Sequence, residues 1–364
     1  MSRRRRFIAG GAAVAALVVA TVGEGAVEAQ STAKPLLTDL NSPKGIDIAP
    51  DGAIIIAQGA FSDPPGGPVL RYDRTAPKRR RVTEVTDPFN LIDVAISPLD
   101  GTGWAIAADL VLYHQLADGT IVPVLDITAY QSTDPDPVDQ DDFPEETNPY
   151  GLTIMANGEA LVADAANNDV IRVTPDGVPT TVARFDLETI STDHLDPAEF
   201  PGLPPELTAE AVPTSVTIGP DGAIYVGELK GFPFRPGSSH VWRIDADAEG
   251  AWCSVNTPNS SCTVYKNNLT AIQDIDFNLK NRRLYVYELA ADGVLAFEAG
   301  FESGDFPPAV LLEIGRTAGG KMRRRELAAG QLSQPGGVAV APNGRIFVTD
   351  GVFTEGRLLR VTRG

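Results

Sequence analysis

The chain has 364 residues and a formal net charge of −18, because 48 acidic residues outnumber 30 basic ones. Nucleic acids and anionic membranes attract basic surfaces, so this charge argues against both as partners. It suits solubility outside the cell and is compatible with cation binding.

Residues 1–29 have the features of an export signal. Four arginines, Arg3 to Arg6, precede an apolar run that ends at Val22, and small residues stand before Gln30. This order predicts a signal peptide; "RRRFI" also resembles the twin-arginine export motif, although an ordinary secretory signal fits almost as well. The run is shorter than the about 18 residues of a membrane anchor, and we expect no membrane span after signal removal. We therefore expect a secreted or periplasmic bacterial protein whose fold occupies residues 30–364.

The rest of the chain repeats one pattern six times. Each unit has a short run of alternating apolar residues, a turn, and a second such run, which indicates strand, turn, strand. The units are residues 42–58, 90–109, 148–164, 212–228, 271–288 and 334–350.

The turns of these units combine proline, aspartate or asparagine, and glycine, as in Pro50-Asp51-Gly52. Proline presets one turn dihedral, the acid or amide caps the turn, and glycine adopts a positive φ. In the second unit, which carries an insertion, we expect Gly103 to take the glycine position. In the fifth, Lys280-Asn281 stands without glycine, and asparagine tolerates this conformation best after glycine.

Two further strands follow each pair, for example "VLRYD" and "RRVTEV", so each unit has about four strands. The chain ends after the third strand of the last unit, "RLLRVT", and "KPLLTDL" precedes the first unit. An N-terminal strand that completes the last sheet would close a ring and leave no exposed edge. The sequence therefore predicts an all-β fold, a six-bladed β-propeller with four strands per blade whose last blade is closed by the N-terminal strand.

Two long connections, residues 127–147 and 186–211, are rich in proline and acidic residues. Both join the fourth strand of one blade to the first strand of the next, so they lie on the face where second strands end. We call this face the top face. The connections are either solvated loops or a lid over the central channel.

An acid recurs at the top end of the second strands. Counting six residues from each turn glycine, with one extra residue in the fifth unit, reaches Gln58, Asp109, Asp164, Glu228, Glu288 and Asp350. These side chains either bind a cation such as Ca²⁺ or Mg²⁺ or, as we favour, accept backbone N–H groups of the next loop and lock neighbouring blades together.

A second set of equivalent positions lies nearest the axis, where first strands begin. It consists of Gly45, Asp93, Gly151, Ser215, Asp274 and Gly337. Asp93 and Asp274 break the small-residue pattern in two blades that face each other across the ring. For these two, metal binding and a structural role are evenly balanced, and they are the candidate ligands for Ca²⁺ or Mg²⁺.

Cysteine and histidine offer little catalytic signal. Cys253 and Cys262 predict a local disulfide in an exported protein, with two free thiols as the alternative. The histidines His114, His194 and His240 have no metal-ligand spacing. His194, in an acidic loop, is either an acid/base group or an exposed residue without a role. We expect His240, at the start of a third strand, to be packed or paired there.

Basic residues concentrate in two runs, Lys78 to Arg81 and Lys321 to Arg325, near outer strands. We interpret both runs as salt-bridged rims, and contact with a polyanion is the less favoured alternative.

Three segments resemble a known bacterial family: "NPYGLTIMANGEALVADAANNDVIRV", "VPTSVTIGPDGAIYVGELKGFPFRPG" and "QPGGVAVAPNGRIFVTD". This is the secreted propeller family named for the scytonemin gene cluster, the ScyD/ScyE-like proteins. The resemblance covers nearly all of residues 30–364 and implies an extracytoplasmic six-bladed propeller of the NHL/TolB-like kind. It implies no settled activity.

A related group, the gluconolactonase-like propellers, holds a divalent metal at the axis through acid and amide side chains just before first strands. The matching positions here are Lys44, Ile92, Tyr150, Thr214, Gln273 and Gly336. None is a carboxylate, so that metal site does not transfer. Asp93 and Asp274 are offset by one residue and would point differently.

These observations favour a monomeric exported propeller, without established catalysis, that binds a small ligand or an extracytoplasmic protein on its top face. Tyr150, Phe232 and Phe234 would supply apolar contact. The acidic ring would set the charge preference, through Asp93, Asp164, Glu228, Asp274, Glu288 and Asp350. The alternative is a divalent-metal-dependent hydrolase or lyase that works through Asp93, Asp274 and Glu228.

Overall fold

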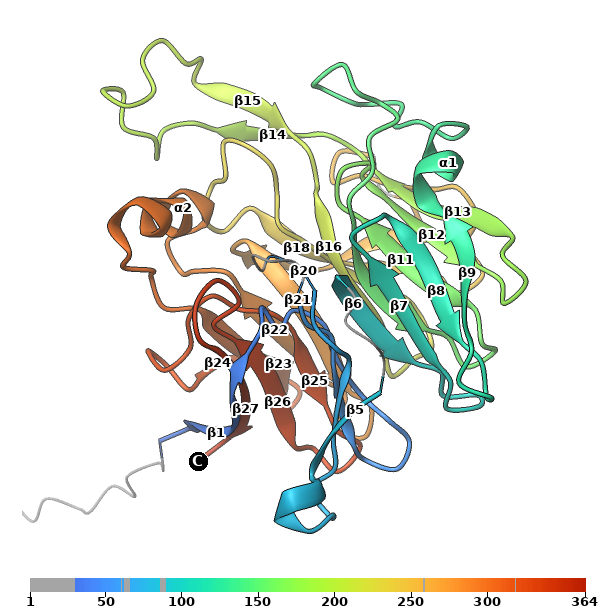
Figure 1. Ribbon diagram of the computed structural model, residues 1–364. Coiled ribbons are helices and arrows are strands. Elements are labelled where there is room, and N and C mark those ends of the chain that lie inside the picture. Colours follow the sequence, from blue (N-terminus) through green and yellow to red (C-terminus); the bar gives the residue numbers. More distant parts are fainter. Residues whose placement is uncertain (1–29, 60, 62–65, 86–89, 258, 318) are drawn as a thin grey trace, which may run out of the picture.

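The computed structural model describes residues 30–364 except 60, 62–65, 86–89, 258 and 318. Within this part, β-sheets surround a common axis, and the fold is the predicted six-bladed β-propeller (Figure 1). The predicted export signal, residues 1–29, lies outside the described residues. None of the described helices has the length and apolar character that crossing a membrane requires.

Each blade begins at the axis and adds antiparallel strands outward. Blades 1 to 3 are β2 (Ile46–Ile48), β3 (Ile54–Ile56), β4 (Leu70–Tyr72), β5 (Val82–Glu84); β6 (Leu91–Ile96), β7 (Gly103–Ala107), β8 (Val111–Gln115), β9 (Ile121–Asp126); and β10 (Pro149–Ile154), β11 (Ala160–Asp164), β12 (Asp169–Val173), β13 (Pro179–Phe185). Blades 4 to 6 are β16 (Pro213–Ile218), β17 (Ile224–Glu228), β18 (Ser239–Ile244), β20 (Cys262–Leu269); β21 (Ile272–Asn278), β22 (Arg283–Glu288), β23 (Val310–Arg316), β24 (Met322–Leu327); and β25 (Val338–Val340), β26 (Ile346–Asp350), β27 (Gly356–Thr362), β1 (Thr32–Leu40).

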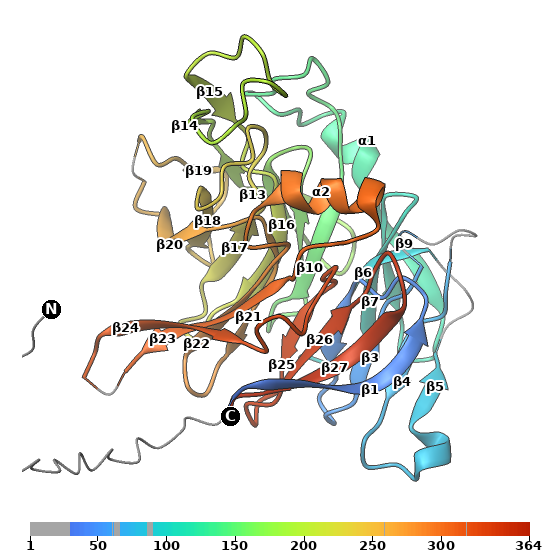
Figure 2. The ribbon, with the colours of Figure 1, turned by 90° about the vertical axis from the view of Figure 1, so that its left-hand side faces the viewer.

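The N-terminal strand closes the ring, as predicted. β1 pairs antiparallel with β27, from Thr32 opposite Thr362 to Leu40 opposite Gly356. Figure 2 shows the two strands side by side at the opposite ends of the colour scale. Leu40 is buried in the core between blades 6 and 1. The first and last described strands therefore complete one sheet.

The turns between first and second strands each place one residue in the left-handed region. Four are the expected glycines, with φ of 85°, 89°, 79° and 82° at Gly52, Gly158, Gly222 and Gly344. In blade 2 the residue is Gly101 (φ 78°), so the assignment to Gly103 was wrong. In blade 5 it is Arg282 (φ 59°) and not Asn281.

These two corrections change the count along the second strands. Six residues after Gly101 comes Ala107. In blade 2 Ala107 pairs with Leu91, as Asp164 pairs with Pro149 in blade 3, so Ala107 occupies the position equivalent to Asp164. Asp109 therefore falls outside the set of equivalent acids, and it lies exposed in the following turn. Six residues after Arg282 comes Glu288, so blade 5 needs no extra residue.

The first strands approach each other closely around the axis, which explains their small residues. A Cβ added to Gly151 would lie 2.8 Å from both the carbonyl oxygen of Thr214 and the Cα of Ser215 in the next blade. A contact that short with backbone atoms cannot be relieved by a side-chain movement. Glycine is thus required at this position by the convergence of the blades.

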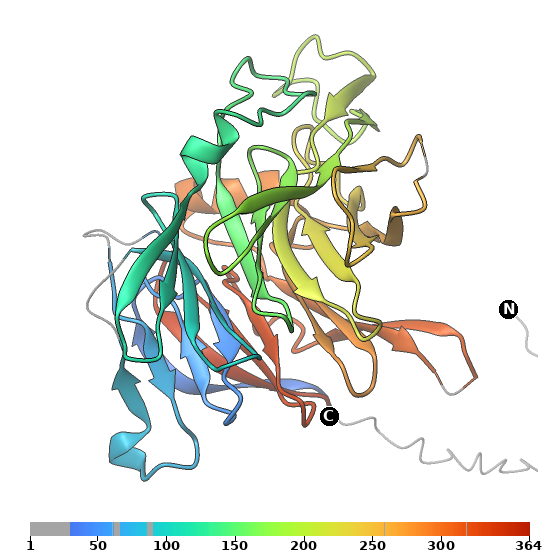
Figure 3. The same ribbon diagram turned by 90° about the vertical axis from the view of Figure 1, so that its right-hand side faces the viewer.

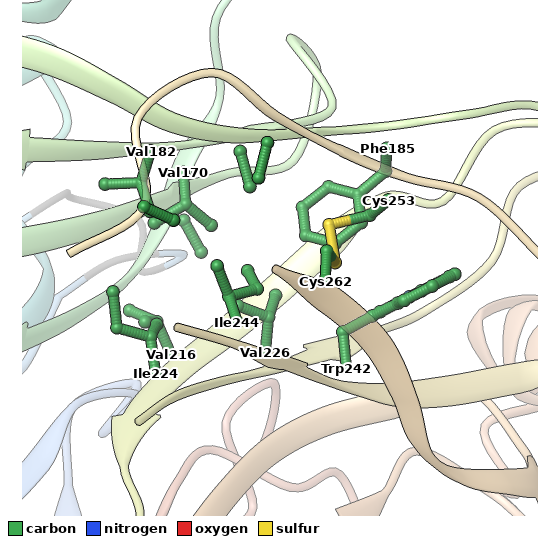
Figure 4. Packing of buried hydrophobic residues seen from close by; sticks show 14 of the residues in the cluster. Val170, Val182, Phe185, Val216, Ile224, Val226, Trp242, Ile244, Cys253 and Cys262 are labelled. Carbon is green, nitrogen blue, oxygen red and sulfur yellow. A yellow bond between two sulfur atoms is a disulfide. The ribbon is translucent and has the colours of Figure 1, made fainter. Parts of the chain in front are cut away.

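Blade 3 has a fifth strand, which the repeat pattern did not predict. β19 (Ala251–Cys253) lies in the connection between β18 and β20 of blade 4, yet it pairs in parallel with β13. Cys253 and Cys262 form the expected disulfide, with 5.2 Å between their Cα atoms. Since Cys262 begins β20, the bond joins two neighbouring sheets and does more than staple one loop. Figure 4 shows it beside Phe185 and Trp242 in the core shared by blades 3 and 4.

Additional elements cover the top face. They are α1 (Ile127–Gln131), the hairpin of β14 (Glu188–Ser191) and β15 (Glu206–Ala209), and α2 (Val294–Ser303). Figures 1, 2 and 3 show them on one side of the ring. Helix α2, which was not predicted, is inserted between β22 and β23 and ends at Gly304 with a φ of 75°. A short 3₁₀ turn, Lys78–Arg80, lies between β4 and β5.

Deleting residues 30–40 tests the closure of the ring. The deletion removes β1 and its buried Leu40, and it exposes the outer edge of β27. We expect a loss of about 4 kcal/mol or more in the free energy of unfolding, since fully burying one leucine alone stabilises by about 1.5–3 kcal/mol. Thermal unfolding measures this, with deletion of residues 1–29 as the control. Equal melting temperatures for the two truncated proteins would contradict the closure.

Candidate functional site

Three of the predicted acids hold the loops that enter their own blades. The carboxylates of Asp164, Glu288 and Asp350 accept the backbone N–H groups of Asn148, Thr270 and Ser333, at 2.7, 2.9 and 2.8 Å. Each donor lies in the connection from the preceding blade, and the amide Gln58 accepts from Asn41 in the same way at 2.9 Å.

These acids are buried, and this affects their charge. Asp164 and Asp350 are 0% exposed and Glu288 is 1% exposed. Burial raises the pKa of Glu288 to about 7 and also raises the pKa of Asp164 and of Asp350. Their geometry is that of acids that accept backbone N–H groups, the role favoured above over cation binding. None of the three side chains is open to a ligand on the surface.

Glu228, at the equivalent position of blade 4, belongs to a different arrangement. One carboxylate oxygen accepts the backbone N–H of His240 at 2.9 Å, and the other accepts the indole N–H of Trp242 at 2.8 Å. The Lys230 ammonium lies 2.9 Å from Glu228 and 2.9 Å from Glu188 of the β14–β15 hairpin. His240 Nε2 lies 3.2 Å from Glu188. We call Glu188, Glu228, Lys230 and His240 the buried ion cluster.

The groups of the buried ion cluster shift one another's pKa values. Burial by itself lowers the pKa of Lys230, but the neighbouring charges of Glu228 and Glu188 outweigh it and the pKa is raised. For His240, burial lowers the pKa, but the hydrogen bond to Glu188 together with the charges of Glu228 and Glu188 outweighs it, so the pKa is also raised. Burial works against ionisation of Glu188, yet His240 and Lys230 lower its pKa to about 2. The Lys230 ammonium thus faces two carboxylates, and the His240 ring contacts one of them.

Oxygen and nitrogen atoms of Glu188, Glu228 and His240 lie within 4.8 Å of one another, a spacing that a metal could bridge. Here the ammonium of Lys230, 2% exposed, stands between the two carboxylates. The protein therefore supplies the cation itself. The result is that the β14–β15 hairpin is attached to blade 4. The pairing expected for His240 is present.

Asp93 and Asp274, the axial candidates, connect neighbouring blades. Asp93 accepts the backbone N–H of Leu152 in blade 3 at 2.8 Å. Asp274 accepts the N–H of Val338 in blade 6 at 2.7 Å and the hydroxyl of Ser215 in blade 4 at 2.6 Å. Burial raises the pKa of Asp93 to about 7 and raises that of Asp274.

Two further axial acids were missed by the sequence analysis. Asp47 accepts the N–H of Ile96 and Asp276 accepts the N–H of Val340, each at 2.6 Å. Burial raises the pKa of Asp47 to about 6 and raises that of Asp276 well above its usual value. Both stand two residues after a position of the axial set, so the strand period of two places them on the same face and could have revealed them.

Residues at or just before the beginning of first strands meet across the axis. The Lys44 ammonium donates to the carbonyl oxygen of Tyr150 at 2.7 Å and lies 3.8 Å from the centre of the Tyr150 ring. The Tyr150 hydroxyl accepts from the amide of Gln273 at 2.8 Å. Lys44 is 4% exposed, and its charge lowers the pKa of Asp93 and Asp274 against the effect of burial.

This arrangement does not fit the axial metal of the gluconolactonase-like propellers. The metal-ligand positions carry no carboxylate, and the ammonium of Lys44 stands among them. Asp93 and Asp274 come from opposite blades, and no group of three metal-ligating side chains within 4.8 Å includes them in the part of the chain that the structure describes. We derive no reaction step through a metal at the axis.

The top face also contains a cavity that the sequence did not reveal. It measures about 290 Å³ and lies between the hairpin tip, the β17–β18 loop and the start of α2. Its lining residues are His194, Leu195, Asp196, Glu199, Phe200, Phe234, Pro236, Asp292 and Leu295. Apolar side chains are thus combined with three carboxylates in one cavity.

Of the predicted apolar contacts, Phe234 lines this cavity, and Phe232 touches Phe200 with ring centres 5.9 Å apart. Tyr150 belongs to the axial group with Lys44 and Gln273, and no described ring contact joins it to Phe232 or Phe234. The structure therefore divides the predicted set between two places on the molecule.

The loop around the cavity is held by polar contacts. His194 Nε2 lies 2.9 Å from the carbonyl oxygen of Pro233, and Arg235 pairs with Asp193 and donates to the carbonyl oxygen of Ser191 at 3.3 Å. Together with the buried ion cluster, these contacts position the hairpin tip against the β17–β18 loop.

Comparisons with known proteins agree with the fold. No protein-family model matches the chain, and no curated protein matches it. The PQQ-bound aldose sugar dehydrogenase of Streptomyces coelicolor is 14% identical, with a TM-score of 0.51 over 92% of this chain and 99% of that one. The soluble aldose sugar dehydrogenase of Escherichia coli is 12% identical, with a TM-score of 0.54 over 92% and 100%. A virginiamycin B lyase of Staphylococcus aureus is 15% identical, with a TM-score of 0.47 over 90% and 99%. At these identities the two dehydrogenases establish similarity in fold alone, the β-propeller.

Replacing Lys230 with methionine tests the buried ion cluster. The change leaves the fully buried Glu228 without its cation, and breaking a buried pair in this way costs about 3–5 kcal/mol. We expect urea unfolding at neutral pH to show a loss of that size. The control is Arg71→Met, which breaks a partly exposed pair with Asp51 on blade 1 and should leave the unfolding midpoint nearly unchanged. Equal midpoints for Lys230→Met and the unmodified protein would contradict the role of the cluster.

Proposed function

We propose that this chain is an exported binding protein whose top-face cavity takes a small molecule with an apolar body and a positive charge. The observation that carries the proposal is the lining of the cavity, in which Phe200, Phe234, Leu195 and Leu295 stand beside carboxylates. Small-molecule sites in proteins are concave, mainly apolar, and have a few polar groups that orient the ligand.

The charges of the lining set the preferred ligand. Asp196, Glu199 and Asp292 are acidic, and no lysine or arginine lines the cavity among the described residues. Opposite charges across a site favour binding of the complementary ligand and disfavour like-charged ones. A cationic amine attached to an aromatic or aliphatic group is complementary in both respects.

The walls of the cavity belong to a fixed structure, which favours binding. The β14–β15 hairpin is attached to blade 4 by Lys230 and Glu188, and Phe234 packs against the start of α2. A site formed in advance loses less conformational entropy when a ligand binds. The cavity is therefore suited to recognise one shape.

Export and the finer family assignment rest on the sequence. The signal-like residues 1–29 and the acidic composition support a secreted or periplasmic location. The motif "GPDGAIYVGELKGFPF" supports membership of the ScyD/ScyE-like group. We include both in the proposal. A monomer is the expected state.

A panel of paired probes tests the proposal. Tryptamine and phenethylamine should bind, whereas indole-3-acetate and phenylacetate, of similar shape but opposite charge, should not. Isothermal titration calorimetry measures binding. We expect Phe200→Ala to weaken amine binding at least about tenfold, which corresponds to about 1.4 kcal/mol, because it removes an apolar wall. Asp292→Asn should weaken amine binding in the same direction.

The control variant is Asp247→Asn, which removes an equally exposed carboxylate between β18 and β19, outside the cavity. It should leave amine binding unchanged. Equal affinity for amines and acids, or equal effects of Asp247→Asn and Asp292→Asn, would overturn the proposal.

A further inference from the structure

A second cavity lies on the side of the ring opposite the top face, between blades 4 and 5. It measures about 970 Å³ and is formed by β20, by the turns that precede β17 and β22, and by the ends of β23 and β24. We call it the blade 4–5 groove. It is larger than the top-face cavity and differs from it in charge.

The blade 4–5 groove is basic in an acidic protein. Lys266, Arg282 and Arg316 line it, and none of the three forms an ion pair with a carboxylate in the part of the chain that the structure describes. Arg243 also lines it, but this residue is neutralised by Asp221 and Asp245, each at 2.8 Å. Three cations of the groove are therefore left without a neutralising carboxylate among the described residues.

An aromatic surface stands among these cations. Tyr265 is 37% exposed, and its ring is fixed edge-on by Tyr225, with ring centres 4.9 Å apart, and by Phe277 at 6.1 Å. Arg282 and Arg316 line the same cavity as this ring. Burial raises the pKa of Tyr265, the charges of Arg316 and Arg282 act to lower it, and the charge of Asp221 acts to raise it. The groove thus offers a rigid ring with cations beside it.

The basic surface continues around blade 5. A cavity of about 320 Å³ at the β23–β24 hairpin is lined by Arg283, Arg316, Arg323, Arg325 and the single acid Glu313, which pairs with Arg283. Gly315 and Arg316 line both cavities, so the two are contiguous. Figure 2 shows this hairpin extending outward from the ring. The two contiguous cavities together offer more room than one small anion needs.

We propose that the blade 4–5 groove binds an acidic polysaccharide, a chain of sugar rings that carries repeated carboxylate or sulfate groups. Lys266, Arg282 and Arg316 bind the anionic groups, and the arginines offer planar donor pairs that match carboxylate and sulfate oxygens. Tyr265 packs against a sugar ring, while Asn267, Asn281 and Thr263 provide hydrogen-bonding groups for hydroxyls.

A sugar chain fits this groove better than a single-stranded nucleic acid. Nucleic-acid grooves present successive aromatic side chains on which neighbouring bases stack. Only Tyr265 among the aromatic residues lining this groove has a large exposed area; Tyr225 is 3% exposed. The overall charge of −18 also opposes the extended backbone contacts that nucleic-acid binding requires.

Binding of defined polymers by the purified protein tests the proposal. The probes are polygalacturonate, dextran sulfate, neutral dextran and oligo-dT, titrated at about 50 mM salt, where screening of surface charges is modest. We expect polygalacturonate or dextran sulfate to bind, and the stronger of the two identifies carboxylate or sulfate as the preferred group. Neutral dextran and oligo-dT should bind at least tenfold more weakly.

Variants assign the binding to the groove. Arg282→Ala/Arg316→Ala should weaken binding of the acidic polysaccharide at least tenfold, and Tyr265→Leu should weaken it while leaving the affinity for inorganic sulfate unchanged. The matched control, Lys78→Ala/Arg79→Ala, removes two exposed cations on blade 1, outside the groove. It should change the affinity less than twofold.

The arginine side chains are exposed, so the variants should melt at the temperature of the unmodified protein. Absence of polysaccharide binding, equal losses in both double variants, or tighter binding of oligo-dT through Arg282 and Arg316 would overturn the proposal. These outcomes are independent of amine binding at the top-face cavity.

Discussion

The innermost strand of each blade is an edge strand, and the fold depends on how its unpaired N–H groups find acceptors. At the axis, these groups have no neighbouring strand within their own sheet. Asp93 and Asp274 accept N–H groups from the first strands of the adjacent blades. Asp47 and Asp276 do the same two residues further along their own first strands. A buried N–H group without an acceptor is costly, so these carboxylates stabilise the ring where the sheets converge.

This constraint explains several features that sequence alone left open. The axial acids accept hydrogen bonds from neighbouring blades, so several carboxylates converge at the axis. This convergence resembles a metal site, although the carboxylate oxygens already accept N–H groups. Their raised pKa values follow from burial. At the top face, acids at the ends of second strands also accept backbone N–H groups. Asp164, Glu288 and Asp350 accept them from the connections that lead from the preceding blade. The top-face loops and the β14–β15 hairpin are attached to this ring.

The six blades and the closing strand could be predicted because both follow from local patterns of period two and from turn residues. The errors arise at turns where the residue types do not specify which position adopts the left-handed conformation. Gly101 and Gly103 both stand near the turn of blade 2, and only the backbone geometry shows that Gly101 has the positive φ. Arg282 adopts a left-handed conformation that its residue type does not favour.

The remaining features depend on contacts between distant segments. β19 leaves blade 4 and joins blade 3, and nothing in "AWC" specifies that partner. The buried ion cluster joins Glu188 to Lys230, which are distant in the sequence. The top-face cavity is formed by the hairpin tip, the β17–β18 loop and the start of α2. Sequence analysis found Glu228 and Phe234 but could not assign their neighbours. The two proposed binding places lie on opposite sides of the ring and carry opposite charge.

Hydrogen exchange at the axis tests the central claim most directly. The amides of Leu152 and Val338 should exchange slowly in the unmodified protein, because carboxylates of neighbouring blades accept them. Asp93→Ala should accelerate exchange at Leu152 by at least about tenfold and leave Val338 unchanged, whereas Asp274→Ala should do the reverse. Exchange at both amides as fast as in exposed loops of the unmodified protein, or no selective change in either variant, would contradict the account.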